Sequence, residues 1–151
     1  MDALVSTVAD NFRSVHQRLR ETVQDLDADA LNWAPAAETN SIAVLVVHTL
    51  GSEADVLRIV GGVPSDRDRA AEFRTSAASA QDLMQRLDAA DALLAELAPG
   101  LTADGLEMVR ERPPRPPQTG LYWLVNNYGH ACEHLAHVQL TRQLWQARQG
   151  G

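Results

Sequence analysis

Lysine is absent from this sequence, so all 13 positively charged side chains are arginines, and 20 acidic side chains outnumber them. The arginines form no basic run, and the formal net charge is -7. A chain of this charge is repelled by the phosphate backbone of nucleic acids and by anionic membrane surfaces. We therefore expect neither a nucleic acid nor a membrane as a partner.

Cysteine and long apolar runs are also scarce. The one cysteine, Cys132, excludes an internal disulfide and fits a reducing compartment. The first residues lack the basic and apolar segments of a signal peptide. The longest apolar run, residues 42–47, is too short to span a bilayer. These features lead us to expect a cytoplasmic protein.

Aromatic residues make up only 5% of the chain, whereas alanine is abundant, and this balance favours helices over a sandwich or a barrel. Hydrophobic residues account for 45% and charged residues for 22%, which is an ordinary globular composition. A length of 151 residues fits one domain, residues 1–151, that buries its own apolar core.

Apolar residues recur at steps of three and four in four segments, which is the period of an amphipathic helix. These segments are residues 4–26, 42–60, 83–97 and 120–148. Asp2 and residues 39–41 offer N-cap side chains for the first two helices, and Ser79 with Asp82 resembles a capping box before the third. The second segment also suits a buried strand, but its length and its lack of internal breakers favour a helix.

The segments between the predicted helices differ in character. Residues 63–78 are polar and rich in alanine and serine, and we interpret them as a long crossover between the second and third helices. The proline-rich run, residues 112–117, cannot be helical and predicts a stiff, extended loop, with a ligand for a proline-reading domain as the alternative. Together the segments predict an all-α fold, a four-helix bundle with one long crossover.

Histidines carry the chemical signal of this sequence. His130 and His134 lie one helical turn apart, a spacing that lets two imidazoles converge on one ion. His48 lies midway along an apolar helix, where a buried imidazole must be paired or ligated. Facing helices of a bundle would bring the three together as metal ligands, and such a set leaves a coordination position open. A paired core histidine and a solvated histidine face are the structural alternatives.

Other polar residues are weaker candidates. His137 lies one turn beyond His134 and is a candidate acid or base near the metal, or simply a surface or core histidine. His16, among arginine and glutamine, is expected to be solvated, and Cys132 faces away from His134. Three acids are candidates to orient the imidazoles, with exposed charges as the alternative: Glu53, Asp55 and Glu133.

Four features of this chain occur together in one known family. They are Leu31–Pro35 after the first helix, Ser41-Ile42 leading to His48, Gly61-Gly62 after the second helix, and His130-x-x-x-His134-x-x-His137. In their order and spacing the chain resembles the DinB-like superfamily over nearly its whole length. The resemblance implies a four-helix bundle with one metal ion held by His48, His130 and His134. Many members have Gly-Gln after the second histidine of the pair, where this chain has Ala136-His137.

The resemblance also implies a range of functions. Several relatives are metal-dependent S-transferases or isomerases that use a low-molecular-weight thiol such as mycothiol, bacillithiol or glutathione. The leading hypothesis is therefore such an enzyme, with one divalent metal ion (zinc or nickel favoured), a small-molecule substrate and a homodimeric assembly. A metal-dependent hydrolase and a non-catalytic metal- or ligand-binding protein are the alternatives, since the residues do not choose among them.

Overall fold

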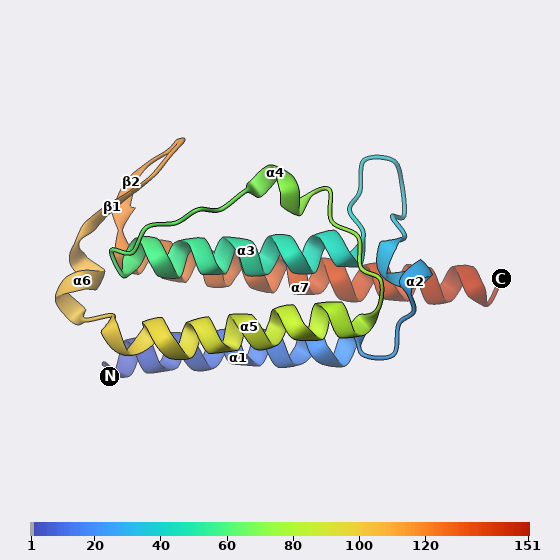
Figure 1. Cartoon of the computed structure of the whole chain (residues 1–151), viewed down its shortest axis with the longest axis horizontal. Coiled ribbons are helices and arrows are strands. Elements are labelled where there is room, and N and C mark those ends of the chain that lie inside the picture. Colours follow the sequence, from blue (N-terminus) through green and yellow to red (C-terminus); the bar gives the residue numbers. More distant parts are fainter. Residues whose placement is uncertain (1) are drawn as a thin grey trace.

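The computed structural model describes residues 2–151 and contains four long helices that pack side by side (Figure 1). They are α1 (Ala3–Val23), α3 (Ile42–Val60), α5 (Ala80–Leu97) and α7 (Gly120–Gln149). Helix α3 packs against α7 and α5, and α1 packs against the same two helices on the other side of the bundle. The predicted all-α, four-helix bundle is confirmed.

Helix ends follow from side chains that satisfy free backbone groups. The carboxylate of Asp2 accepts a hydrogen bond from the N–H of Leu4 at 2.8 Å, and the Ser41 hydroxyl accepts one from Val44 at 3.2 Å. The predicted capping box before α5 does not form. Ser79 makes no side-chain capping bond within residues 2–151, whereas the Asp82 carboxylate accepts from the N–H of Ala78 at 2.8 Å.

The first helix ends earlier than predicted, at Val23 rather than near Asp27. Asp27 instead caps the short helix α2 (Ala28–Asn32) by accepting from the N–H of Ala30 at 2.9 Å. An aspartate that bonds its own downstream backbone competes with continuation of the preceding helix.

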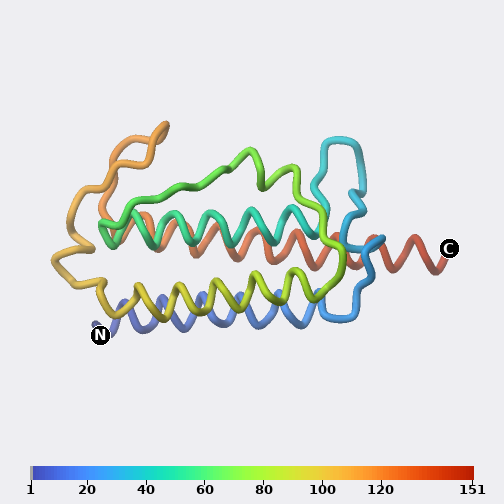
Figure 2. Tube along the Cα trace, viewed as in Figure 1, coloured from blue at the N-terminus to red at the C-terminus, as the bar shows by residue number. Residues whose placement is uncertain are grey.

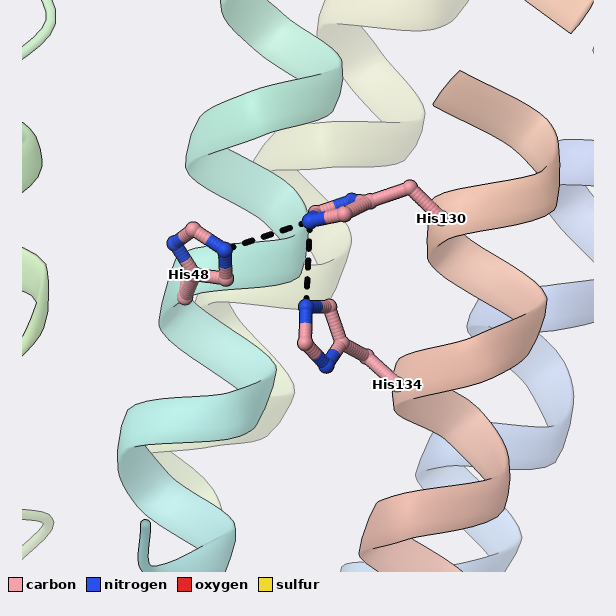
Figure 3. A group of neighbouring side chains, drawn as sticks. All are labelled: His48, His130 and His134. Atoms are coloured by element: carbon pink, nitrogen blue, oxygen red, sulfur yellow. Dashed lines mark hydrogen bonds between the residues drawn. The ribbon is translucent and has the colours of Figure 1, made fainter. Parts of the chain in front are cut away.

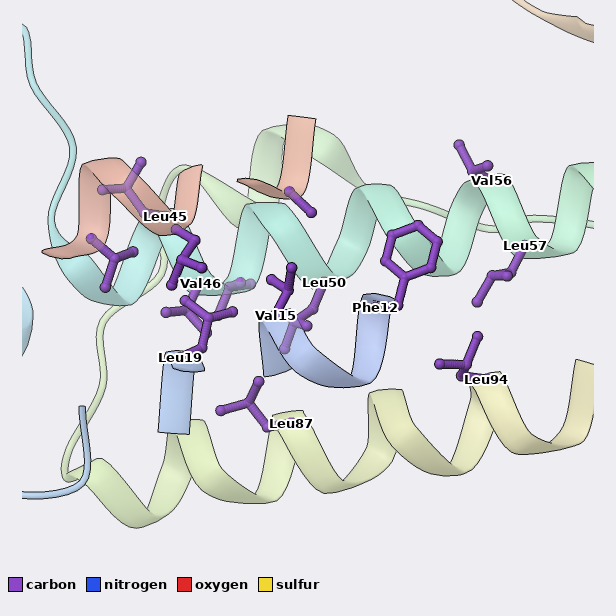
Figure 4. Packing of buried hydrophobic residues seen from close by; sticks show 14 of the residues in the cluster. Phe12, Val15, Leu19, Leu45, Val46, Leu50, Val56, Leu57, Leu87 and Leu94 are labelled. Atoms are coloured by element: carbon purple, nitrogen blue, oxygen red, sulfur yellow. The ribbon is translucent and has the colours of Figure 1, made fainter. Parts of the chain in front are cut away.

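A continuous apolar core lies between the four long helices (Figure 4). Phe12 and Leu19 of α1, Leu57 of α3, and Leu87 and Leu94 of α5 are all within 2% of complete burial. Helix α3 buries apolar side chains around most of its circumference, which explains why its sequence also suits a buried strand. Truncation of one such leucine to alanine costs about 2–5 kcal/mol of stability.

The crossover between α3 and α5, residues 61–79, runs back along the outside of α3 (Figure 2). It carries one short helix, α4 (Arg69–Glu72), that packs onto α3. This placement agrees with the predicted crossover and adds a helical turn to it. The crossover therefore brings polar side chains to the middle of an otherwise apolar helix.

The segment between α5 and α7 corrects one prediction. After a single 3-10 turn (Ala98–Gly100) and helix α6 (Ala103–Glu107), strands β1 (Val109–Arg112) and β2 (Arg115–Thr119) form an antiparallel hairpin. The proline-rich run is thus non-helical, as predicted, but it is a paired hairpin rather than an extended loop. Pro113 and Pro114 occupy the turn between the strands. A residue at this place donates no hydrogen bond to the paired strand, so the missing N–H groups of proline are tolerated.

The apolar content of the helices also bears on membranes. Among the helices of residues 2–151, none combines the length and the apolar character that a membrane crossing requires.

Candidate metal centre

Three imidazoles meet where α3 and α7 lie against each other (Figure 3). The Nε2 atom of His130 lies 3.2 Å from Nε2 of His48 and 3.0 Å from Nε2 of His134. Each of the three residues offers a ligand atom within 4.8 Å of the others. His48 is buried and the two α7 histidines are half-buried, so the structure brings together the three residues that the sequence singled out.

The contacts among these ring nitrogens favour a shared cation. A neutral imidazole carries one proton, so the Nε2 atom of His130 can donate a hydrogen bond to one neighbour and not to both. Burial, together with His134 and His48, lowers the pKa of His130 to about 4, and burial also lowers the pKa of His134. Uncharged nitrogens that converge on one point are a suitable donor set for a divalent metal ion.

An acid in the crossover orients His48. The Glu72 carboxylate of α4 lies 3.0 Å from Nδ1 of His48, so this nitrogen donates and Nε2 keeps its lone pair toward His130. Arg67 donates to both oxygens of Glu72, at 2.7 and 2.8 Å. Burial alone would raise the pKa of Glu72, but the hydrogen bonds from Arg67 and His48 lower it below its ordinary value. The carboxylate therefore stays ionised beside the imidazole.

Glu72 was missed in the sequence because its crossover has no regular spacing relative to α3. One signal was available in Gly51, a glycine inside a well-formed helix. A Cβ atom at position 51 would overlap the Glu72 carboxylate, so only glycine leaves room for this acid to reach His48. A glycine within a helix costs about 1 kcal/mol relative to alanine, so its presence there indicates that another group approaches the backbone closely.

Glu53 and His16 depart from the predictions. His16 was expected to be solvated, yet it is fully buried in the bundle, with Nε2 2.8 Å from Glu53 and Nδ1 2.7 Å from Asp91. Glu53 is buried with it and orients His16, not a histidine of the metal cluster. The prediction failed because the polar neighbours of His16 in sequence point to solvent, while the residue itself faces α3 and α5.

The remaining candidates lie around the cluster. His137 is exposed, and its Nδ1 lies 3.3 Å from Nδ1 of His134, on the opposite side of that ring from Nε2. Asp55 is buried and accepts from Ser65 at 2.6 Å and from Arg112 at 2.8 Å. Glu133 is exposed, and Cys132 packs against the apolar core. His137 alone among them contacts a histidine of the cluster.

A cleft of about 680 Å³ opens beside the histidines. Its floor includes His48, His130 and Asn127, and its walls come from the crossover and from the β1–β2 hairpin. The Asn127 amide donates to the Ser52 hydroxyl at 2.8 Å, which fixes both polar groups at the floor. A volume of this size admits a metabolite-sized molecule, so the cluster is accessible to a ligand.

Comparisons with known proteins agree with this architecture. The family model described as the DinB superfamily matches residues 11–138. A conserved protein from Enterococcus faecalis superposes with a TM-score of 0.79 at 19% identity, over 95% of this chain and 97% of that chain. A search of curated proteins found no match.

Two other solved structures are similar in fold. A DinB-like protein from Bacillus subtilis has a TM-score of 0.68 at 19% identity, over 91% of this chain and 90% of that chain. A DinB-like protein from Bacillus cereus has a TM-score of 0.71 at 12% identity, over 90% of this chain and 89% of that chain. Identities this low establish a shared fold and carry no statement about activity.

Proposed function

The chain belongs to the DinB superfamily, and on that basis we propose that it is a metal-dependent enzyme acting on a small-molecule substrate. In this proposal His48, His130 and His134 hold one divalent ion, with zinc and nickel favoured. The convergence of three Nε2 atoms, with His48 and His130 lining an open cleft, carries the proposal. Structural zinc sites are closed by four protein ligands, whereas catalytic sites keep one position for a ligand.

The surrounding residues prepare this site in three ways. Glu72 holds the proton of His48 on Nδ1 and leaves Nε2 free to coordinate. Arg67 keeps Glu72 ionised and in place. Burial keeps His130 uncharged near neutral pH, because its pKa is about 4. A metal would therefore meet little competition from protons at these nitrogens.

We favour a thiol-using transferase over a hydrolase. A divalent ion in this site would lower the pKa of a thiol or of water, and the thiol route agrees with the relatives that the sequence resembles. His137, an exposed imidazole beside His134, is proposed to accept or supply a proton directly and not through the metal-bound ring. The small-molecule substrate would occupy the cleft beside His48 and His130.

Metal content is the first test. We expect about one divalent ion per chain in tag-free protein, measured by mass spectrometry of metals. His48→Ala and His134→Ala each remove one ligand atom and should reduce the content to background. Gln143→Ala is the control, since it removes an exposed side chain further along α7 and should retain the ion. A wild-type protein that takes up neither zinc nor nickel would contradict the proposal.

Thiol dependence is the second part of this test. Metal-loaded protein is assayed with a panel of electrophiles, with and without glutathione, mycothiol or bacillithiol. Turnover that requires a thiol supports the transferase. Turnover without a thiol, with a metal-dependent limb near neutral pH, would favour the hydrolase. One ion per chain with no turnover and no thiol binding would instead indicate the non-catalytic alternative.

A further inference from the structure

Positive charge is concentrated in one part of this acidic molecule. The chain carries 13 arginines against 20 acidic side chains, yet five of the arginines line the cleft beside the histidines. These five are Arg67, Arg69, Arg110, Arg112 and Arg115. They come from the crossover and the hairpin, the two segments that wall the cleft.

Two of these arginines are engaged by acids of the fold. Arg67 binds Glu72 through two hydrogen bonds, at 2.7 and 2.8 Å. Arg112 donates from Nε to Asp55 at 2.8 Å and from Nη2 to the Ser52 hydroxyl at 3.2 Å. Their charges are neutralised, and their role is to attach the crossover and the hairpin to α3.

The other three have no carboxylate within ion-pair distance among residues 2–151. Arg110 donates to the Val60 carbonyl at 3.2 Å, and its Nε is buried with no hydrogen-bond partner in the described chain. Arg115 donates to the Asn126 side chain at 3.3 Å. Arg69 stacks on the ring of Phe73, 4.8 Å from its centre. Three guanidinium groups thus line the cleft without an ion pair, and Glu111 is the one acid of its lining that is also unpaired among residues 2–151.

We propose that this cleft binds an oxyanion group, a carboxylate or a phosphate, of the small molecule that the protein acts on. The planar guanidinium donates two parallel hydrogen bonds to either group, which makes arginine the preferred side chain for both. The proposal rests on the proposed function for the orientation of that molecule: its anionic end lies at Arg69, Arg110 and Arg115, and its reacting end lies at His48 and His130. The binding of the anion itself does not depend on the metal.

A small molecule is favoured over a nucleic acid as the source of the anion. The phosphate backbone of a nucleic acid would extend beyond the cleft and be repelled by a protein whose net charge is -7. A cleft of about 680 Å³ instead encloses a single metabolite. Asn126 also lines the cleft, with Asn127 at its floor, and both supply further amide groups for an oxyanion or for a neighbouring polar group.

The test is calorimetric titration of chelator-treated, metal-free protein with glutarate and with inorganic phosphate, and with glutaramide as the uncharged control. We expect saturable binding of at least one anion at one site, and none of glutaramide. The probe that binds more tightly identifies the oxyanion. Arg69→Gln and Arg115→Gln should each weaken binding by about 10–150-fold, because a hydrogen bond to a charged group contributes about 1.5–3 kcal/mol.

Arg74→Gln is the matched control, since it removes one exposed arginine outside the cleft and should leave the affinity unchanged. Absence of saturable binding by both anions, or an equal loss in Arg74→Gln, would overturn the proposal. Metal content is measured on the same samples before chelation. Anion binding without any metal uptake would contradict the proposed metal-dependent function but support the anion site. Metal uptake without anion binding would contradict the anion site and leave the proposed function standing.

Discussion

At the scale of single residues, the site depends on Glu72 as much as on the histidines. The carboxylate sets which nitrogen of His48 carries the proton, and Gly51 provides the space that lets it do so. Residues that orient a ligand in this way typically contribute 10–100-fold to metal affinity. A substitution of Glu72 is therefore predicted to lower the metal affinity, although it removes no ligand atom.

We expect Glu72→Gln to weaken zinc binding by about 10–100-fold, measured by competition with a chromophoric chelator. The amide is uncharged and cannot hold the Nδ1 proton of His48 as strongly. Gly51→Ala should act in the same direction, because its methyl group displaces the Glu72 side chain. Glu96→Gln, an exposed glutamate of α5, is the control. Equal affinity in Glu72→Gln and Glu96→Gln would show that Glu72 does not orient the ligand.

At the scale of elements, the hairpin and the crossover are attached to the bundle through polar contacts to α3. Arg112 of β1 and Ser65 of the crossover both bind Asp55. The Trp123 indole of α7 donates to the Arg110 carbonyl at 3.1 Å and adds a second attachment for the hairpin. Apart from Trp123, the residues that make these contacts lie outside the apolar core, so the hairpin can loosen while the four long helices stay packed.

Arg112→Gln is expected to lower the protection of β1 and β2 against amide hydrogen exchange by about 10–150-fold, since the lost hydrogen bond to Asp55 contributes about 1.5–3 kcal/mol. Protection in α1 and α5 should not change, because their burial is independent of the hairpin. Exchange is followed by mass spectrometry, with Arg74→Gln as the control. A uniform loss across all helices would mean that the hairpin is part of the cooperative fold.

At the scale of the whole molecule, a buried polar network joins three of the four long helices. His16 of α1 contacts Glu53 of α3 and Asp91 of α5, and Arg20 of α1 binds Asp91 at 2.6 Å and Asp88 at 2.9 Å. Burial lowers the pKa of His16, but Glu53 and Asp91 outweigh it and raise the pKa above its ordinary 6.5. Folding is therefore linked to protonation of this imidazole.

We expect His16→Ala to lower the free energy of unfolding by about 3–5 kcal/mol near pH 6, because it leaves Glu53 buried without its partner. A raised pKa contributes stability that is fully present below the unfolded value of 6.5 and is lost as pH rises through the folded value. The difference from wild type should therefore shrink at alkaline pH. Urea denaturation at several pH values measures it, with His137→Ala as the control. A difference that is constant with pH would rule out this linkage.

Much of the fold follows from periodicity in the sequence. The four helices could be predicted because three- and four-residue spacing requires a buried stripe, and the only efficient way to bury four stripes is a bundle. His130 and His134 were predictable for the same reason, since their separation is set by one helical turn. The assignment of His48 to the same site needed the further assumption that its helix faces theirs. A homodimer and a single-domain organisation stay predictions.

The sequence by itself determined the four long helices, their order and the three histidines singled out as ligands. Only the tertiary structure decided what surrounds those histidines. Glu72, Arg67 and the hairpin arginines reach the site through segments of irregular backbone, whose path depends on contacts with distant residues and leaves no period in the sequence. His16 shows the same limit in a regular helix: its burial depends on which helices pack beside α1, and local polarity does not encode that choice.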